Sequence, residues 1–423
     1  MTLTADFTPV PVTRAPGTGN PPVDMNNTSL ELAAMGGTYN ILNTAYAGGA
    51  DPTGASSSSA AIQAAINAAL SAAVSQFDNG PMRAPAVVIP FGNYLITTPL
   101  NFSGGSSEAG IRITGASRGS RLFSTGSTIF DFQTTYLEGF EFDHLTIDAT
   151  GGHCFTNPSL KFCWFHDLNL VQNSPGYSVW NQVQANSSLQ NTTFADVRFW
   201  VYPDSSGNRS VPGWNILEVT GGDYFAEVWW ERLTGMNMPN SSGNFDNSQY
   251  MVYLANNPGP PLGYASTIIF RACSFHNCLG GGIQALSVSH ATFENVGFYD
   301  VYTQGTPNKS IANSLIKIGT YPSSMASRGI EFRGVTRSQG GLTTGSGPSD
   351  IEVSSDTQEV LVTGWSWTGW QATNIQGQIN LNGALHCVLI AIDAGTTVLN
   401  PASDTIIISA GVISVGGTAV TVP

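Results

Sequence analysis

The chain has 423 residues with a net charge of −13, and only 10% of its residues are charged. An acidic protein repels the phosphate backbone, so nucleic-acid binding is excluded, and no uninterrupted apolar run reaches the ~18 residues of a membrane span. Scarce charge combined with 47 glycines is typical of a protein built from many short strands and turns. The five cysteines fit no zinc-ligand spacing and are interpreted as small core residues, so neither a metal nor a cofactor is predicted.

The first segment, residues 1–36, is rich in Pro, Thr, Asn and Gly and lacks the apolar stretch of a secretion signal. We interpret it as an extended arm that attaches the protein to a partner. The absence of a signal indicates a protein that does not leave a cell through a standard cleaved leader.

Residues 37–100 have the pattern of a small cap. A strand is expected over 39–42, and a turn follows. Apolar residues at helical spacing then predict a helix over 60–73, with a serine among Ser56–Ser59 as its N-cap. Further strands are expected at 87–89 and from residue 92 onward.

This cap resembles the N-terminal signature of the pectate-lyase-like superfamily, which includes phage tailspikes and several polysaccharide-active enzymes. The resemblance rests on residues 61–66, which read A-I-Q-A-A-I, and on residues 88–96, which read V-I-P-F-G-N-Y-L-I. The Asp pair that the family carries ahead of its helix is replaced here by Ser56–Ser59. The resemblance implies an all-β fold, the right-handed parallel β-helix, and it implies a homotrimer if the protein is a tailspike. The resemblance indicates little about activity, because function depends on the site and not on the fold.

A repeat of the form aromatic-x-x-Val/Leu-x-apolar runs through residues 101–370, which we interpret as the β-helix itself. Each copy predicts a strand, a corner and a second strand, with the apolar residues stacked inside. A polar residue such as His144, Asp167, Asp196 or Asn295 is expected at the corner. Copies begin at Phe142, Phe165, Phe194, Trp230, Phe270, Phe293 and Phe332, and a degenerate one begins at Val362.

The spacing of the copies predicts loops. Phe142 and Phe165 are 23 residues apart, and so are Phe270 and Phe293, which sets the length of a plain rung. Larger spacings elsewhere must leave the core as loops, and these are expected to emerge at one corner and to line one face. The segments concerned are 171–190, 201–224, 237–265 and 301–328. Residues 371–423 are expected to form final rungs or a β cap, because a solenoid end needs covering.

The looped segments supply the candidate site residues. Aromatic rings stack on the apolar faces of sugars, and paired carboxylates can hydrolyse a glycosidic bond. The carbohydrate-binding candidates are Tyr177, Trp180, Tyr202, Trp214 and Trp229, and the catalytic candidates are Glu218, Asp223 and Glu227. The register assigns Trp230 to the core and therefore Trp229 to the outer face. An alternative stays open, in which the carboxylates are merely solvated and the aromatic residues pack the loops onto the solenoid.

A second set of outward positions follows the repeat: Trp200, Met236, His276 and Tyr299. His276 and Tyr299 are one plain rung apart, so they are expected to be stacked neighbours, either as simple ladder packing or as a catalytic pair. The motif sets of the pectate lyases and polygalacturonases are missing, which leaves the chemistry open.

Three functions fit these observations. The first is a tailspike-like or tail-fibre-like virion protein that recognises, and in one version depolymerises, host surface glycans. Its partners would be two further copies of the chain, other tail proteins bound through the arm, and the host polysaccharide. The second is a free polysaccharide hydrolase or lyase, acting extracellularly. The third is a non-catalytic structural or adhesion protein.

Overall fold

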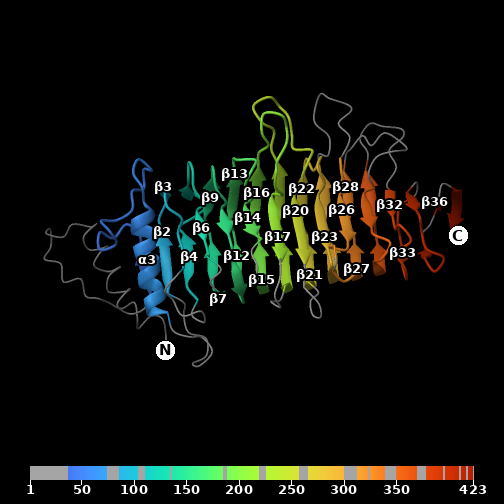
Figure 1. Ribbon diagram of the computed structural model, residues 1–423, viewed down its shortest axis with the longest axis horizontal. Coiled ribbons are helices and arrows are strands. Elements are labelled where there is room, and N and C mark those ends of the chain that lie inside the picture. The colour runs from blue at the N-terminus through green and yellow to red at the C-terminus, as the bar shows by residue number, and fades with distance from the viewer. Residues whose placement is uncertain are drawn as a thin grey trace, which may run out of the picture.

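The protein is a right-handed parallel β-helix in which three sheets run along one axis (Figure 1). The computed structural model describes residues 37–73, 85–102, 110–133, 136–183, 188–218, 225–256, 265–299, 312–322, 324–338, 349–368, 378–393, 396–408, 411–415 and 418–422. In most rungs the chain passes through sheet A, then sheet B, then sheet C. The fold class expected from the repeats is therefore confirmed. No helix in the described part of the chain is long and apolar enough to cross a membrane.

Sheet A is the longest of the three, with 15 strands in the described residues. Its strands are β1 (Thr38–Asn40), β2 (Ala86–Ile89), β4 (Arg112–Gly115), β7 (Tyr136–Glu138), β8 (Glu141–Asp143), β11 (Ser159–Lys161), β12 (Trp164–His166), β15 (Leu189–Ala195), β18 (Phe225–Glu231), β21 (Ala265–Arg271), β24 (Val288–Glu294), β27 (Arg328–Arg333), β30 (Gln358–Thr363), β33 (Val388–Ile390) and β35 (Ile406–Ile408).

Sheets B and C complete the rungs. Sheet B consists of β3 (Gly92–Leu95), β5 (Ser120–Phe123), β9 (Thr146–Ala149), β13 (Asn169–Gln172), β16 (Arg198–Val201), β19 (Thr234–Asn237), β22 (Ser274–His276), β25 (Gly297–Tyr299), β28 (Thr336–Ser338) and β31 (Ser366–Thr368). Sheet C consists of β6 (Phe130–Asp131), β10 (Phe155–Thr156), β14 (Trp180–Gln182), β17 (Trp214–Glu218), β20 (Val252–Asn256), β23 (Ile283–Leu286), β26 (Ile316–Gly319), β29 (Ile351–Val353), β32 (Gln378–Asn380), β34 (Thr397–Leu399), β36 (Gly411–Val415) and β37 (Thr418–Val422).

The N-terminal end of the solenoid is covered by α3 (Ser59–Ala72), which lies over the first rungs in Figure 1. Its inward stripe includes Ile62, Ile66 and Leu70, all buried against the core. Ser58 occupies the N-cap position, but the expected capping bond is not made. The Ser58 hydroxyl instead accepts a hydrogen bond from the Asp51 N–H at 3.0 Å, which ties the preceding turn to the helix.

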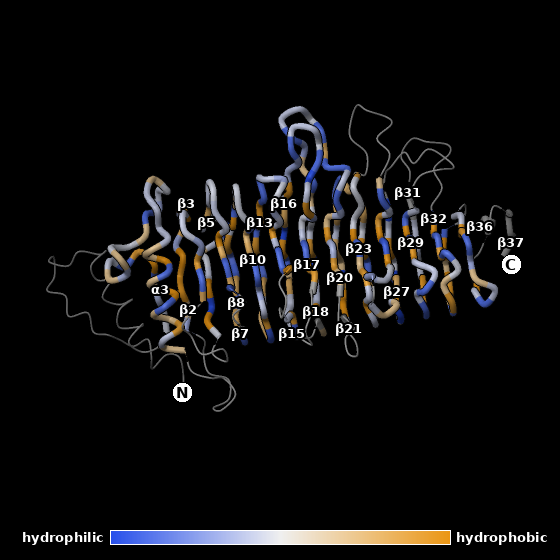
Figure 2. The backbone as a smooth tube through the Cα atoms, in the orientation of Figure 1, coloured by the Kyte–Doolittle hydropathy of each residue, from blue (hydrophilic) through white to orange (hydrophobic). Residues whose placement is uncertain are grey.

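The core contains a column of stacked aromatic side chains from successive rungs of sheet A. Phe142 stacks on Phe165 with ring centroids 4.9 Å apart, and Trp230 stacks on Phe270 at 4.6 Å. The register pairs Phe142 with Phe165 and Phe270 with Phe293, so one plain rung spans the 23 residues expected from the sequence. Figure 2 shows the hydrophobic residues recurring along the whole length of the solenoid. All five cysteines are buried and none forms a disulfide bond, as expected for small core residues.

A column of left-handed residues turns the chain from sheet A to sheet B. His144, Asp167, Asp196 and Asn295 all have φ between 52° and 56°. Asn, Asp and His tolerate this conformation better than other side chains that carry a Cβ. The polar corner residues expected from the repeat are thereby confirmed, and a strand of sheet B begins two residues after each of them.

Two long loops lie at the corner between sheets B and C, and they project from the same end of the strands in Figure 1. Both contain the same turn, Pro203 to Asn208 and Pro239 to Asn244. In the first, the Asp204 carboxylate accepts the Ser206 and Asn208 N–H groups at 2.8 and 2.9 Å. Asn240 repeats this pattern and also donates to the Asp204 carbonyl. The expectation that surplus residues leave at one corner holds for these two loops.

Candidate functional site

Sheet A presents its functional side chains on either side of the inward aromatic column. Residues directly before and after each inward residue point outward, because side chains alternate along a strand. On β8 these are Glu141 and Asp143, and on β12 they are Trp164 and His166. The register pairs Trp164 with Glu141 and His166 with Asp143, so the four side chains occupy one patch of the outer face.

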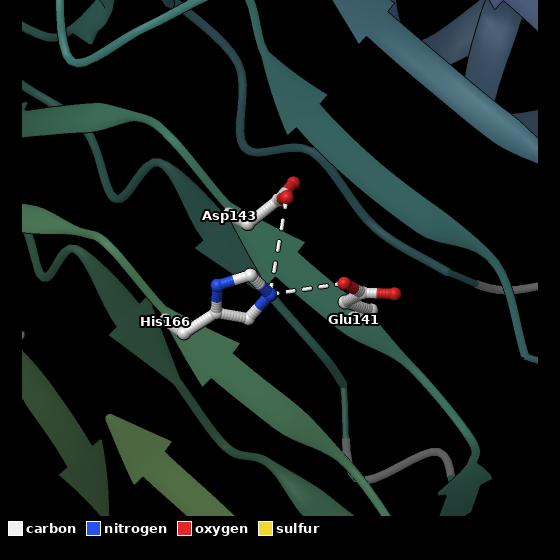
Figure 3. Close-up of side chains that lie close together, drawn as sticks. All are labelled: Glu141, Asp143 and His166. Atoms are coloured by element: carbon white, nitrogen blue, oxygen red, sulfur yellow. Dashed lines mark hydrogen bonds and ion pairs between the residues drawn. The ribbon is translucent and has the colours of Figure 1, made fainter. Parts of the chain in front are cut away.

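Glu141, Asp143 and His166 meet at the centre of this patch (Figure 3). The His166 Nε2 lies 2.9 Å from a Glu141 carboxylate oxygen and 3.8 Å from an Asp143 oxygen. The other ring nitrogen, Nδ1, lies 3.1 Å from the Asp167 carboxylate. Both nitrogens therefore face carboxylates, an arrangement that favours the imidazolium form.

Asp143 is held from the other side by Arg112 on β4. The guanidinium makes two hydrogen bonds to the carboxylate, through Nε at 3.3 Å and through Nη2. Burial alone would raise the pKa of Asp143, but the hydrogen bonds from Arg112, Thr114 and His144 outweigh it and lower the pKa. The Asp143 side chain has no exposed surface, so it cannot touch a ligand and serves to orient its neighbours.

Glu141 and His166 are the groups of this cluster that can transfer a proton. Their side chains keep 26% and 11% exposure, and they share a direct hydrogen bond. Burial lowers the pKa of His166, whereas its hydrogen bonds to Glu141 and Asp167 raise it, and the net direction is upward. The ligand atoms of Glu141, Asp143 and His166 lie within 4.8 Å of one another, so these residues could hold a cation, although Arg112 already provides a positive charge at Asp143.

The histidines should titrate at well-separated pH values. We expect an NMR titration to give His166 a midpoint above the ordinary value of about 6.5, while desolvation lowers the pKa of His153 to about 4. The stabilisation from the imidazolium of His166 is complete below the unfolded pKa and is lost as the pH rises through the higher folded pKa. Equal midpoints for the two residues would contradict the hydrogen-bond pattern around His166.

Trp164 stands beside this cluster with 49% of its surface exposed. Its indole lies against the His166 imidazole, with ring centroids 4.0 Å apart and planes inclined by 32°. One indole face is thus covered by His166, so the exposed half of the residue's surface belongs to the opposite face and the ring edges. Phe162, two residues earlier, is also exposed, at 48%. Two large exposed aromatic side chains on one rung are unusual on a surface that needs no partner.

Two of the predicted sugar-binding residues are in the core, and that prediction is wrong. Trp180 and Trp214 have no exposed surface, and their rings stack with centroids 5.4 Å apart. They lie on β14 and β17, paired in register within sheet C and not in loops. Neither indole can reach a sugar.

The remaining sugar-binding candidates lie at the surface in two different places. Tyr177 is 36% exposed with its ring against His153, and Tyr202 is half-buried at the start of a long loop. Both backbone carbonyls accept hydrogen bonds from the buried guanidinium of Arg209. Trp229 is half-buried on the outer face of sheet A, while Trp230 is fully buried, as the register predicted.

Of the three predicted catalytic carboxylates, the structure describes the side chain of Glu227 alone. Asp223 and the side chain of Glu218 lie outside the described residues. Glu227 is exposed on β18, where its φ is 57° and the pairing with β15 is interrupted for one residue on each strand without a change of register. The cluster around His166 was missed, although the repeat contains its signal. Aligning Phe142 with Phe165 puts Glu141 beside Trp164 and Asp143 beside His166.

The outward ladder on sheet B is as expected. Trp200, Met236, His276 and Tyr299 follow one another in register from β16 to β25. The rings of His276 and Tyr299 stack with centroids 5.3 Å apart and planes inclined by 29°. Ladder packing accounts for these side chains.

Comparison with known proteins places the fold. The model of the family described as rhamnogalacturonase A/epimerase, pectate lyase-like, matches residues 45–307. No curated protein sequence matches the chain. The catalytic domain of Agl-KA has a TM-score of 0.53 and 15% identity, over 89% of this chain and 68% of that one.

Two viral proteins have similar structures. ORF18 of Geobacillus virus E2 has a TM-score of 0.49 and 14% identity, over 94% of this chain and 64% of that one. The tailspike protein of Acinetobacter baumannii phage AM24 has a TM-score of 0.39 and 16% identity, over 86% of this chain and 53% of that one. The chain thus spans less than two thirds of the length of either viral protein.

Proposed function

Because the chain belongs to the rhamnogalacturonase A/epimerase, pectate-lyase-like family, we propose that it binds a polysaccharide on the outer face of sheet A. The observation that carries this proposal is the open indole face of Trp164, 49% exposed beside hydrogen-bonding groups of Glu141 and His166. An aromatic plane next to fixed donors and acceptors matches a sugar, which has an apolar ring face and a polar rim.

The setting that we propose is the tail of a virus particle. There the chain would act as a homotrimeric tailspike or tail fibre, attached through residues 1–36, and would recognise glycans of the host surface. The support is the resemblance of residues 61–66 and 88–96 to the N-terminal signature that tailspikes share.

Cleavage of the bound glycan is a second candidate function, favoured by the hydrogen bond between Glu141 and His166. Glu141 is the exposed carboxylate of the cluster, and His166 holds a proton within 2.9 Å of it. This pair could exchange a proton with a glycosidic oxygen or with a sugar carbon acid. Asp143, fully buried and bound to Arg112, is unsuited to act as the nucleophile.

The test combines retention on host cells with sizing of host-envelope polysaccharide. We expect Trp164→Ala to weaken retention about tenfold, or by about 1.4 kcal/mol, because the stacking surface is lost. Phe91→Ala is the matched control, since Phe91 is 74% exposed on the cap, and it should bind as the unsubstituted protein does. Equal retention of both variants would refute binding at Trp164.

Sizing of the products decides on cleavage. Shortened oligosaccharides that disappear in Glu141→Gln, while retention persists, would support a depolymerase. Intact polymer in every sample would show that the protein binds the glycan without cleaving it. Neither cleavage nor retention by the unsubstituted protein would refute the proposal and favour a structural role.

A further inference from the structure

We infer that the ligand is a neutral, linear polysaccharide that lies along the solenoid axis and bridges Trp164 and Trp229. This inference rests on the proposed function, because it assumes that Trp164 stacks on a sugar. It adds the direction of the chain, a second subsite and the class of the ligand. Three independent observations support it: the orientation of the Trp164 indole, the register of the outer face, and the pairing of its charges.

The orientation of Trp164 sets the direction of the ligand. Its partner in the stack, His166, is two residues further along the same strand, so the normal of the indole plane runs along the strand. A sugar on the open face of the indole lies parallel to it, with its ring plane across the strands. In an equatorially linked glycan, the glycosidic bonds extend from each sugar close to the plane of its ring. The next sugars can therefore follow the solenoid axis, but they cannot follow the strand.

The register puts a second indole on this path. Trp164 pairs with Thr193 of β15, and Thr193 pairs with Trp229 of β18, so all three occupy one outward ladder. Two strand spacings separate the tryptophans, which is about 9.5 Å. That distance matches two sugars of an extended, equatorially linked chain. One sugar would stack on Trp164, the next would pass over β15, and the third would reach Trp229.

The rung between the tryptophans carries small outward side chains along the path of the middle sugar. Its outward side chains are Thr193 and Ala195, which are smaller than Trp164 and His166 on one side and Trp229 and Glu231 on the other. Thr193 is half-buried and has a hydroxyl that can donate or accept. The outward side chains of this rung are therefore smaller than the tryptophans on the rungs on either side of it.

The charges along this face favour a neutral ligand. Arg112 binds Asp143, Arg232 binds Asp196 through two hydrogen bonds of 2.7 Å, and Arg271 binds Glu294 at 2.9 Å. Each of these guanidinium groups is already neutralised, and the chain as a whole carries −13. A polyanion would meet the carboxylates of Glu141, Asp167 and Glu231 on this face, whereas a neutral glycan needs only the hydroxyl partners that are present.

The experiment measures affinity against ligand length. The probes are neutral β-1,4-linked glucose oligosaccharides of two to six sugars and galacturonate oligosaccharides of the same lengths, titrated by calorimetry. We expect the affinity for the neutral series to rise until three or four sugars and then level off. Trp229→Ala should weaken the tetrasaccharide about tenfold and the disaccharide less than about twofold. Trp200→Ala, a half-buried outward tryptophan on sheet B, is the matched control and should bind both ligands normally.

Each contrary result has a definite meaning. Affinity that does not change beyond two sugars, or a Trp229→Ala variant that binds the tetrasaccharide normally, would overturn the bridging arrangement. Preference for the galacturonate series, or no binding of the neutral series, would overturn the ligand class. In these cases the weaker retention of Trp164→Ala on host cells would still uphold the proposed function. If Trp164→Ala also behaves normally there, the proposed function fails as well.

Discussion

Replacing Trp230 by alanine is expected to lower the free energy of unfolding by about 3–5 kcal/mol. The indole has no exposed surface and lies between two rings of the core column. Its centroid is 4.6 Å from that of Phe270 and 5.7 Å from that of Phe194, with planes within 15° of parallel. Alanine would leave a cavity that neither neighbour can fill, because both are fixed by their own rungs. Urea unfolding followed by circular dichroism measures the loss.

The adjacent residue provides the control for this prediction. Trp229→Ala removes a side chain of the same size from the next position of the same strand, but from the half-buried outer face. It should cost at most about 1 kcal/mol, since most of the freed surface borders water. Equal losses for the two variants would mean that the inward column does not dominate the stability of the rung.

Replacing Arg337 by methionine is expected to cost about 3–5 kcal/mol of stability, because it leaves a buried carboxylate without its cation. Arg337 on β28 forms an ion pair with Asp350, and their side chains are 1% and 0% exposed. Asp350 also accepts the Gln378 N–H at 2.8 Å, which fixes the start of the next rung. Thermal and urea unfolding measure the change.

The double variant separates charge from packing. With Arg337→Met and Asp350→Asn together, no isolated charge stays in the core, and the asparagine oxygen can still accept the Gln378 N–H. We expect the double variant to recover most of the stability lost in Arg337→Met. A double variant as unstable as the single one would show that the arginine acts through its packed side chain and not through its charge.

Much of the architecture could be predicted, because the repeat and the fold have the same period. Phe142, Phe165 and Phe293 mark inward positions of sheet A, and the corner residues follow at a constant offset. Sheet C has no such marker. Its strands follow loops of variable length, so the register of Trp180 and Trp214 could not be counted from the aromatic motif, and both were assigned to the surface.

The candidate site was harder to predict for a physical reason. Glu141 and His166 are 25 residues apart and meet only because two rungs are stacked in register. The catalytic carboxylates were predicted in and beside the long loops, whereas the cluster lies on the flat face of plain rungs. Trp229 was found because its neighbour Trp230 fixes the register. Applying the same rule to the residues on either side of Phe142 and Phe165 would have found the rest.

The parallel register also limits how this surface can change during evolution. Side chains of one outward ladder, such as Trp164, Thr193 and Trp229, can be separated only by whole strand spacings of about 4.8 Å. A substitution that transfers an aromatic residue to the next rung therefore lengthens or shortens the interval by one fixed step. Insertions in the loops leave these steps unchanged. The spacing between aromatic contacts along one ladder of this sheet can therefore take only whole multiples of the strand spacing.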